Sequence, residues 1–176
     1  MKLLITILMT ASSLHAQMLF DFQKKESIKK WVVIDDVVMG GKSDGKMYRN
    51  KENKGVFSGV VSLDNNGGFS SVRHAFPSKK VGSSQKILLR IKGDGKKYQF
   101  RIKHKNEDYY SYRTTFTTKK EWETIEIKTS DLAPTFRGRK LDMPNFNHQS
   151  FEQIGFLIAN KKNERFELLI DSIEFK

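Results

Sequence analysis

Short runs in which hydrophobic and polar residues alternate dominate this sequence. In KYQFRIK, residues 97–103, the apolar residues Tyr98, Phe100 and Ile102 alternate with polar ones, which is typical of a strand with one buried face. Three further segments alternate in the same way: residues 55–63, 123–128 and 165–175. Two others are almost continuously apolar, which favours central strands packed on both faces: residues 86–91 and 154–159. The pattern therefore predicts a protein built from strands.

No segment carries the spacing of apolar residues that a substantial helix requires; at most, residues 150–153 begin a short turn. Turn-forming residues recur about every ten positions, and many short strands separated in this way predict an all-β sandwich or barrel. The longest region without strand character is residues 130–150. Its aromatic residues Phe136 and Phe146 favour a loop that is ordered over the surface of the domain.

The first 16 residues have the composition of a secretory signal peptide. One basic residue, Lys2, precedes an apolar run from Leu3 to Ala11, and a polar stretch ends at Ala16. The apolar run is about half as long as the ~20 residues that span a bilayer, so we expect cleavage after Ala16 rather than a membrane anchor. Residues 17–176 would then form a single secreted or periplasmic domain, with no transmembrane segment in the mature chain.

Composition narrows the classes of function. The chain has no cysteine, which excludes disulfide bonds and thiol catalysis. Its 32 Lys and Arg residues against 20 Asp and Glu give a formal net charge of +12, but the basic residues are spread along the chain and form no nucleic-acid-binding motif. No nucleic-acid partner is therefore expected. A positive surface would attract anionic polymers or membranes weakly and in a salt-dependent way.

The sequence carries no signature of catalysis or of a cofactor. It lacks the H-E-x-x-H, G-x-S-x-G and P-loop motifs, and the histidines that follow residue 16 are isolated from other metal-binding residues. We therefore predict a non-enzymatic protein without a cofactor. Oxygen ligands for a structural calcium could still converge from separate loops, with Asp171 as one contributor. In the alternative interpretation, such residues only form turns.

Aromatic residues near loops decide whether a β-sandwich can bind a sugar, because a flat ring stacks against a pyranose and amides satisfy its hydroxyl groups. Trp31 begins an apolar run and is assigned to the core. Tyr110 and Tyr112 are expected to share one face of a strand, with Tyr109 on the other. The candidates for a binding surface are Tyr98, Tyr109, Tyr110, Tyr112 and Trp122. The alternative is that these residues are simply favoured in strands.

Six segments taken together resemble the complex I intermediate-associated protein 30 family, named for a mitochondrial assembly factor of NADH:ubiquinone oxidoreductase. They are WVVIDDVVMGGKSDG, FSGVVSLDNNGGFSSVR, IKGDGKKYQFRIK, TTKKEWETIEI, PTFRGR and IGFLIANKKNERFELLIDSIEF. Their order and spacing match from about Phe20 to the C-terminus. The resemblance implies a galactose-binding-like β-sandwich of the jelly-roll type, the fold also used by several carbohydrate-binding modules.

The resemblance also implies a fixed shape for the DNNGGF segment, in which Asn65 and Asn66 match the family signature. The backbone and side-chain amides of this segment can hold a neighbouring loop or a polar ligand, and we expect them to anchor to Asp36 and Arg73. Arg137, in the PTFRGR segment, completes the set of candidate binding residues.

Two functions are compatible with these features. An exported binding or scaffold protein, similar to the family's assembly factor, would hold a protein complex of the cell envelope through an exposed apolar or basic patch, without a ligand-sized cleft. A carbohydrate-binding module for an envelope or extracellular glycan would instead have a groove lined by Tyr or Trp, with converging amides and acids. An enzyme, the third class, would need paired carboxylates in one cleft.

Overall fold

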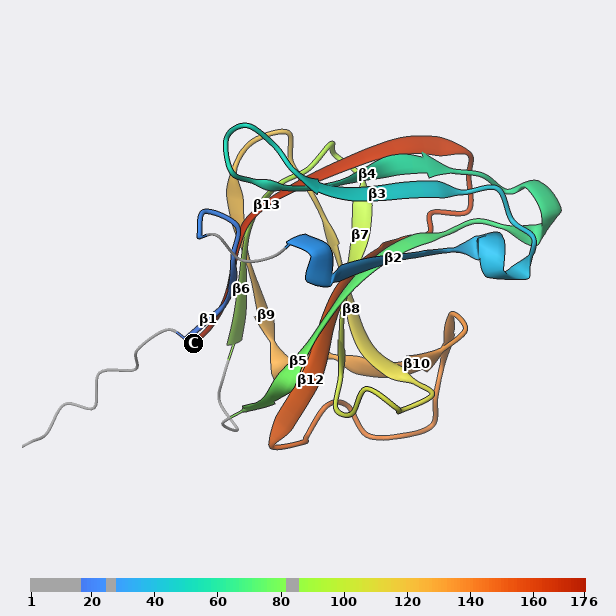
Figure 1. Cartoon of the computed structure of the whole chain (residues 1–176). Coiled ribbons are helices and arrows are strands. Elements are labelled where there is room, and N and C mark those ends of the chain that lie inside the picture. Colours follow the sequence, from blue (N-terminus) through green and yellow to red (C-terminus); the bar gives the residue numbers. More distant parts are fainter. Residues whose placement is uncertain (1–16, 25–27, 82–85) are drawn as a thin grey trace, which may run out of the picture.

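The computed structural model describes residues 17–24, 28–81 and 86–176. These residues form two antiparallel β-sheets that enclose one core (Figure 1). The described helices are all short turns of 3₁₀ helix: η1 (Ile28–Lys30), η2 (Asp36–Met39), η3 (Asp64–Asn66) and η4 (Thr129–Asp131). In the described part of the chain, no helix is long and apolar enough to cross a membrane. The predicted signal peptide, residues 1–16, lies outside the described residues.

The six-stranded sheet has the order β3-β4-β13-β6-β9, and β1 also pairs with β13. Its strands are β1 (Gln17–Asp21), β3 (Asp44–Arg49), β4 (Gly55–Val61), β6 (Lys86–Lys92), β9 (Glu123–Lys128) and β13 (Glu164–Phe175). The register between β13 and β6 shifts between Ile170 and Ser172. This irregularity changes which alternate residues face inward, so both halves of β13 bury their apolar residues: Phe166, Leu168, Ile170, Ile173 and Phe175.

The seven-stranded sheet has the order β11-β10-β8-β7-β12-β5-β2. Its strands are β2 (Trp31–Asp35), β5 (Ser70–Lys80), β7 (Lys97–Lys103), β8 (Ser111–Thr117), β10 (Ala133–Phe136), β11 (Arg139–Lys140) and β12 (Ser150–Ile158). β12 lies between β7 and β5, and its residues 154–158 are all buried, as expected for a central strand. This sheet carries the site described below.

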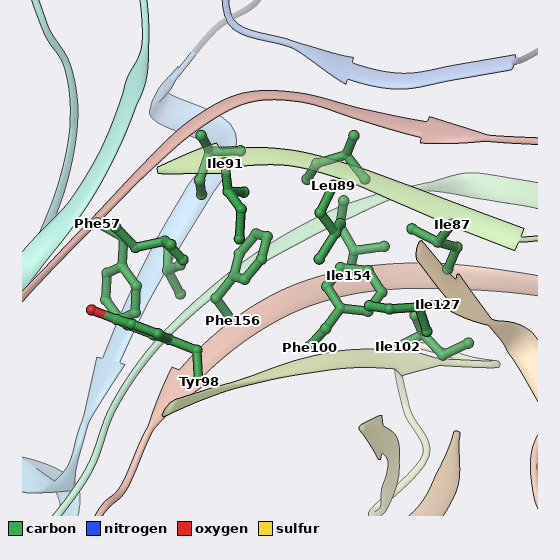
Figure 2. Packing of buried hydrophobic residues seen from close by; sticks show 14 of the residues in the cluster. Phe57, Ile87, Leu89, Ile91, Tyr98, Phe100, Ile102, Ile127, Ile154 and Phe156 are labelled. Carbon is green, nitrogen blue, oxygen red and sulfur yellow. The ribbon is translucent and has the colours of Figure 1, made fainter. Parts of the chain in front are cut away.

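The core lies between the two sheets. Figure 2 shows Ile87, Leu89 and Ile91 of β6 pointing toward Phe100 and Ile102 of β7, and all five side chains are buried. The alternation predicted for residues 97–103 is therefore confirmed: the apolar side chains of β7 enter the core and the polar ones face the outside of the seven-stranded sheet. Trp31 is also buried, as predicted.

The all-β sandwich is confirmed, but three local expectations were wrong. Residues 150–153 do not form a turn, because they begin β12. The segment 130–150 is not a single loop, since it contains β10 and β11, which are too short to show a clear alternation. β6 is fully buried on one face only, with Leu88 and Arg90 partly exposed on the other. Within the same segment, Phe146 is buried, in agreement with an ordered chain.

Candidate functional site

A groove of about 690 Å³ crosses the outer face of the seven-stranded sheet. Its floor comes from β5, β7 and β12, whose inward-facing side chains belong to the core. One end is walled by Val38 and Met39 together with Gly68 and Phe69, and the other end by residues 109–111 and 135–138. Because the strands of the floor are paired on both sides, their backbone groups are used in the sheet and the side chains present the binding chemistry.

A row of three arginines crosses the outer face of the seven-stranded sheet, and two of them, Arg73 and Arg101, line the groove. In the sheet register, Arg73 of β5 lies opposite Gly155 of β12, Gly155 opposite Arg101 of β7, and Arg101 opposite Arg113 of β8. Residues directly opposite one another on neighbouring strands share a face of the sheet. Arg73, Arg101 and Arg113, called the arginine row below, therefore stand on the outer face together.

Gly155 has a steric role in this row. A Cβ atom at this position would lie 2.6 Å from the carbonyl oxygen of Val72 and 3.4 Å from Cγ of Arg73. The first distance is shorter than any ordinary contact, so a larger residue would displace the neighbouring backbone. The missing side chain also leaves room for the stem of Arg73 to cross the floor of the groove.

Amide and hydroxyl groups orient the central arginine. Arg101 donates from Nε and Nη2 to Oε1 of Gln99, at 3.1 and 2.7 Å, and from Nη1 to Oγ of Ser111 at 3.4 Å. Lys103, the next outward-facing residue of β7, donates to the carbonyl oxygen of Asn106 at 2.6 Å. All these acceptors are neutral, so they fix the cations in place without neutralising them.

The groove is electrostatically positive. Burial, together with the positive charges of Arg113 and Arg73, lowers the pKa of Arg101 to about 10. Burial also lowers the pKa of Arg73. The pKa of Lys103 is lowered by burial and by Arg73, although the nearby Asp108 and Glu107 act in the opposite direction. Arg101 still carries its charge at neutral pH, and among the described residues that line the groove none is Asp, Glu or His.

Three aromatic residues form a rim at one end of the groove, and we call Tyr109, Tyr110 and Phe136 the aromatic rim. The ring centroid of Tyr109 lies 5.1 Å from that of Tyr110 and 5.2 Å from that of Phe136, both in edge-on arrangements. Tyr109 is 66% exposed, so its ring faces solvent beside the groove. The guanidinium of Arg137 lies 5.3 Å from the ring centre of Phe136.

The opposite end of the groove is shaped by the buried carboxylate of Asp36. Its Oδ2 accepts hydrogen bonds from the backbone N–H groups of Gly68 at 2.6 Å and Phe69 at 3.1 Å, and from Oγ of Ser43 at 2.5 Å. Its Oδ1 accepts from the N–H of Ser43 at 3.0 Å. A Cβ at Gly41 would lie 2.2 Å from Oδ1 of Asp36, so glycine is required there. The anchoring of DNNGGF to Asp36 is thus present in the structure.

The charge of Asp36 is maintained by these contacts. Burial alone raises the pKa of this carboxyl, but the hydrogen bonds from Ser43, Gly68 and Phe69 together outweigh burial and hold the pKa below its ordinary value. Asp36 is completely buried and faces the loop rather than the groove. Its role in this geometry is to fix the wall formed by Gly68 and Phe69.

The structure brings some of the sequence-predicted residues together. Arg73, Tyr110 and Arg137 line the groove. Asn65 supports the adjoining loop by donating to the carbonyl oxygen of Gly40 at 3.0 Å. The expected anchoring of the loop to Arg73 is wrong, because Arg73 stands in the floor of the groove instead. Among the described residues, the exposed side chain of Asn66 has no hydrogen-bond partner; its backbone φ of 60° is what the turn requires.

Two of the aromatic candidates lie elsewhere. Tyr112 packs against Tyr110, with ring centroids 5.5 Å apart, as expected, but Tyr110 precedes β8 and lines the groove, whereas Tyr112 does not. Tyr112 is buried and shares a hydrogen bond of 2.7 Å with Nε2 of His148. Trp122 lies beside the six-stranded sheet, where Nζ of Lys54 is 5.6 Å from its ring centre. Neither residue lines the groove.

Asp171 also lies away from the groove. Its Oδ1 is 2.6 Å from Nζ of Lys54 and accepts a hydrogen bond from Gln23 at 2.9 Å. Burial raises its pKa, but the bonds from Lys54 and Gln23 outweigh that effect and lower the pKa overall. Within the described parts of the chain, no group of three or more His, Cys, Asp and Glu residues is arranged to hold a metal ion. A structural calcium at Asp171 stays an untested prediction.

Several groove residues were missed at the level of the sequence. They are Gln99, Arg101, Lys103, Gln153 and Gly155, whereas Tyr109 was among the aromatic candidates. The sequence did indicate that the first three face away from the core, because they alternate with the apolar residues of segment 97–103. What the sequence did not reveal is the register that brings Arg73 and Gly155 beside them, because strands far apart in the chain form the floor.

Comparison with known proteins places the chain in a family. A profile of complex I intermediate-associated protein 30 (CIA30) matches residues 20–170. The chain belongs to the CIA30 family. Complex I intermediate-associated protein 30, mitochondrial, from Mus musculus is 25% identical over 90% of this chain, and the match spans 56% of the mouse protein. An uncharacterized protein of Schizosaccharomyces pombe is 28% identical, with 80% of this chain and 74% of that protein covered.

Family membership supports an assembly-factor-like role and corrects one expectation. The mouse relative is named as a mitochondrial protein, which contradicts the secreted or periplasmic localisation predicted from residues 1–16. The predicted resemblance and the galactose-binding-like jelly roll are confirmed. The mouse match covers only part of that protein, so the activity of the whole mouse protein is not transferred to this chain.

Solved structures share the fold. The family 11 carbohydrate-binding module from Clostridium thermocellum, in complex with a β-1,3-1,4-mixed-linked tetrasaccharide, has a TM-score of 0.67 and 22% identity, and the match covers 91% of this chain and 94% of the module. A second structure, of the family 11 module of the cellulase Lic26A-Cel5E from the same organism, has a TM-score of 0.68 and 22% identity over 93% and 95% of the two chains. At this identity the likeness establishes the β-sandwich alone.

Proposed function

We propose that this CIA30-family chain is a non-enzymatic binding protein, assembly-factor-like in that it holds its partner without transforming it, and that the groove on the seven-stranded sheet is its binding surface. The observation that carries this proposal is the groove itself. Its volume of about 690 Å³ falls within the roughly 300–1,000 Å³ of ligand sites. Hydrolysis by paired carboxylates has no support here, because the described lining residues include no Asp or Glu.

The side chains of the groove favour a saccharide as its ligand. The exposed ring of Tyr109 offers a flat surface for stacking, and Gln99 and Gln153 carry amides that can both donate to and accept from hydroxyl groups. A peptide that adds to a sheet pairs with an edge strand, whereas β7 and β12 in the floor already have neighbours on both sides. The proposal therefore assigns the groove to a hydroxyl-rich chain rather than a β-strand.

A second candidate function follows from an exposed apolar patch at the end of the groove. Val37, Val38 and Met39 of η2 are 61%, 77% and 60% exposed. Neighbouring exposed apolar residues are a feature of protein interaction sites, and family membership supports an assembly-factor-like role. In this candidate function, the patch would bind a protein partner beside the groove.

The experiment is a glycan array followed by calorimetry on the purified protein, with Tyr109→Ala as the test variant. Stacking on an aromatic ring contributes on the order of 1 kcal/mol, and about 1.4 kcal/mol is a factor of ten in Kd, so we expect binding to weaken about five- to tenfold. Tyr48→Ala is the matched control, because Tyr48 is an exposed tyrosine on β3 of the other sheet. We expect it to bind as the parent protein does.

The outcomes separate the two candidate functions. Absence of binding to any glycan on the array would contradict the saccharide proposal. Protein binding would then be tested by affinity purification with Val38→Asp beside a Tyr48→Asp control. A protein that is retained by the control and lost only with Val38→Asp would support the apolar patch as the binding surface, and equal loss or equal retention in both variants would contradict it.

A further inference from the structure

We propose that the ligand of the groove is an acidic saccharide, bearing carboxylate or sulfate groups that the arginine row of Arg73, Arg101 and Arg113 holds. This inference rests on the proposed function of the groove as a saccharide-binding surface and names the chemistry of the ligand. Three features of the groove support it. They are its positive charge, the absence of acidic partners for its arginines among the described residues, and the neutral polar groups and aromatic rings beside these arginines.

The first feature is a positive charge that no described residue lining the groove neutralises. Four cationic side chains, Arg73, Arg101, Lys103 and Arg137, line the groove, and none of the other described lining residues is an acid. Arg101 and Arg113 lie directly opposite each other on neighbouring strands. Like charges in this arrangement destabilise a sheet, and charged groups removed from water are normally paired. An anion lying along the row would relieve both costs.

The second feature is the contrast between arginines and lysines. The described residues form seven salt bridges, and in each of them the cation is a lysine. Every described acid that forms a salt bridge is thus paired with a lysine, and none of these salt bridges includes a residue of the arginine row. Arginine presents a planar fork of N–H donors that binds a carboxylate or an oxyanion through two parallel hydrogen bonds. The row therefore has the donor geometry that suits acidic groups repeated along a chain.

The third feature is the combination of this charge with neutral polar groups and aromatic rings. Gln99 accepts two hydrogen bonds from Arg101, which fixes the guanidinium and leaves the amide N–H groups of Gln99 for a ligand hydroxyl. Gln153 and Tyr109 offer a second amide and a stacking surface along the same groove. An acidic peptide would use the cations, but it offers few hydroxyl groups and no ring face for Tyr109. The full set favours an acidic sugar chain.

The test compares ligands that differ only in charge. Polygalacturonate and its methyl ester share a backbone, as do dextran sulfate and dextran, and calorimetry of the full chain at about 150 mM salt measures each affinity. We expect each acidic polymer to bind at least about tenfold more tightly than its neutral counterpart. The two pairs also distinguish carboxylate from sulfate as the preferred group.

Variants locate the binding site. Arg101→Gln is expected to weaken binding of the preferred acidic polymer at least about tenfold, and Arg73→Gln serves as a second variant if Arg101→Gln does not fold. The matched control is Arg165→Gln, which removes the same charge from an exposed position on β13 of the other sheet. We expect the control to change the affinity less than twofold, because the anion contacts the row and not the overall positive surface.

Each alternative result has a defined meaning. If Arg165→Gln weakens binding as much as Arg101→Gln, the attraction is general and the inference is wrong. If neutral and acidic polymers bind equally and Arg101→Gln has no effect, the inference fails while the groove remains a saccharide site. If no saccharide binds, both proposals fail. Tighter, Arg101-dependent binding of poly-glutamate or of single-stranded DNA would overturn the saccharide class.

Discussion

A substitution of Asp36 tests whether its hydrogen bonds stabilise the wall of the groove. Its carboxylate accepts four hydrogen bonds, from the N–H groups of Ser43, Gly68 and Phe69 and from the hydroxyl of Ser43. The substitution Asp36→Ala removes all four acceptor contacts at once and leaves an unfilled space. We predict that this variant folds with a markedly lower free energy of unfolding and a loosened wall at Gly68 and Phe69.

The expected magnitude follows from the contacts. A buried donor left without a partner costs about 1–3 kcal/mol. The hydroxyl of Ser43 can turn toward the carbonyl oxygen of Ser62, 3.4 Å away, and water can reach the partly buried N–H groups of Gly68 and Phe69. Two or three donors at the lower part of that range give a loss of about 3–4 kcal/mol. For a domain of this size, that corresponds to a decrease in Tm of roughly 6–16 °C.

The assay is thermal and urea unfolding followed by circular dichroism, with Asp44→Ala as the control. The side chain of Asp44 is 70% exposed, and its ion pair with Lys46 is 3.7 Å long, so we expect the control to lose less than about 0.5 kcal/mol. Equal Tm values for Asp36→Ala and Asp44→Ala would show that the hydrogen bonds of Asp36 do not stabilise the wall of the groove. Because the pKa of Asp36 is lowered by its hydrogen bonds, its contribution is present above the ordinary carboxyl pKa of 3.8 and is lost as the pH falls through the lower value of the folded state.

Two further predictions concern other parts of the sandwich. Gly155→Ala should lower the free energy of unfolding by about 1–3 kcal/mol, because its Cβ would lie 2.6 Å from the carbonyl oxygen of Val72. The urea midpoint measures this loss, and an unchanged midpoint would contradict the close packing of the floor. Burial and then the charge of His104 lower the pKa of His148, so the unfolded state binds the proton more readily and the stability should fall as the pH drops below about 6.5. His148→Phe should reduce the difference between urea midpoints at pH 8 and pH 5, and an undiminished difference would show that His148 does not contribute.

The sequence was sufficient to predict the sandwich because many core residues recur at every second position within a short segment. Tyr98, Phe100 and Ile102 recur at every second position and all enter the core, as the pleat of a strand requires. The short strands β10 and β11 were missed for the opposite reason: four and two residues are too few to show a period.

The groove was only partly predictable, because its floor depends on pairing between distant segments. Arg73 and Arg101 become neighbours across the sheet only because Gly155 of β12 lies between them. Alternation indicates that Arg101 faces outward but not which strands lie beside it. Tyr110 illustrates the same limit: it contacts Tyr112 as alternation predicts, but β8 begins only at Ser111, so Tyr110 lines the groove while Tyr112 is buried.

An NMR titration of the ¹⁵N-labelled protein with oligogalacturonate tests most directly whether the groove binds an acidic saccharide. Glycine amide signals report on both sheets: Gly68, Gly138 and Gly155 lie along the groove, whereas Gly55 and Gly59 lie on β4 of the six-stranded sheet. If the saccharide binds in the groove, the first three signals shift saturably and the last two do not shift. Shifts confined to Gly55 and Gly59, or equal small shifts across the whole protein, would contradict the assignment of the groove as the binding surface.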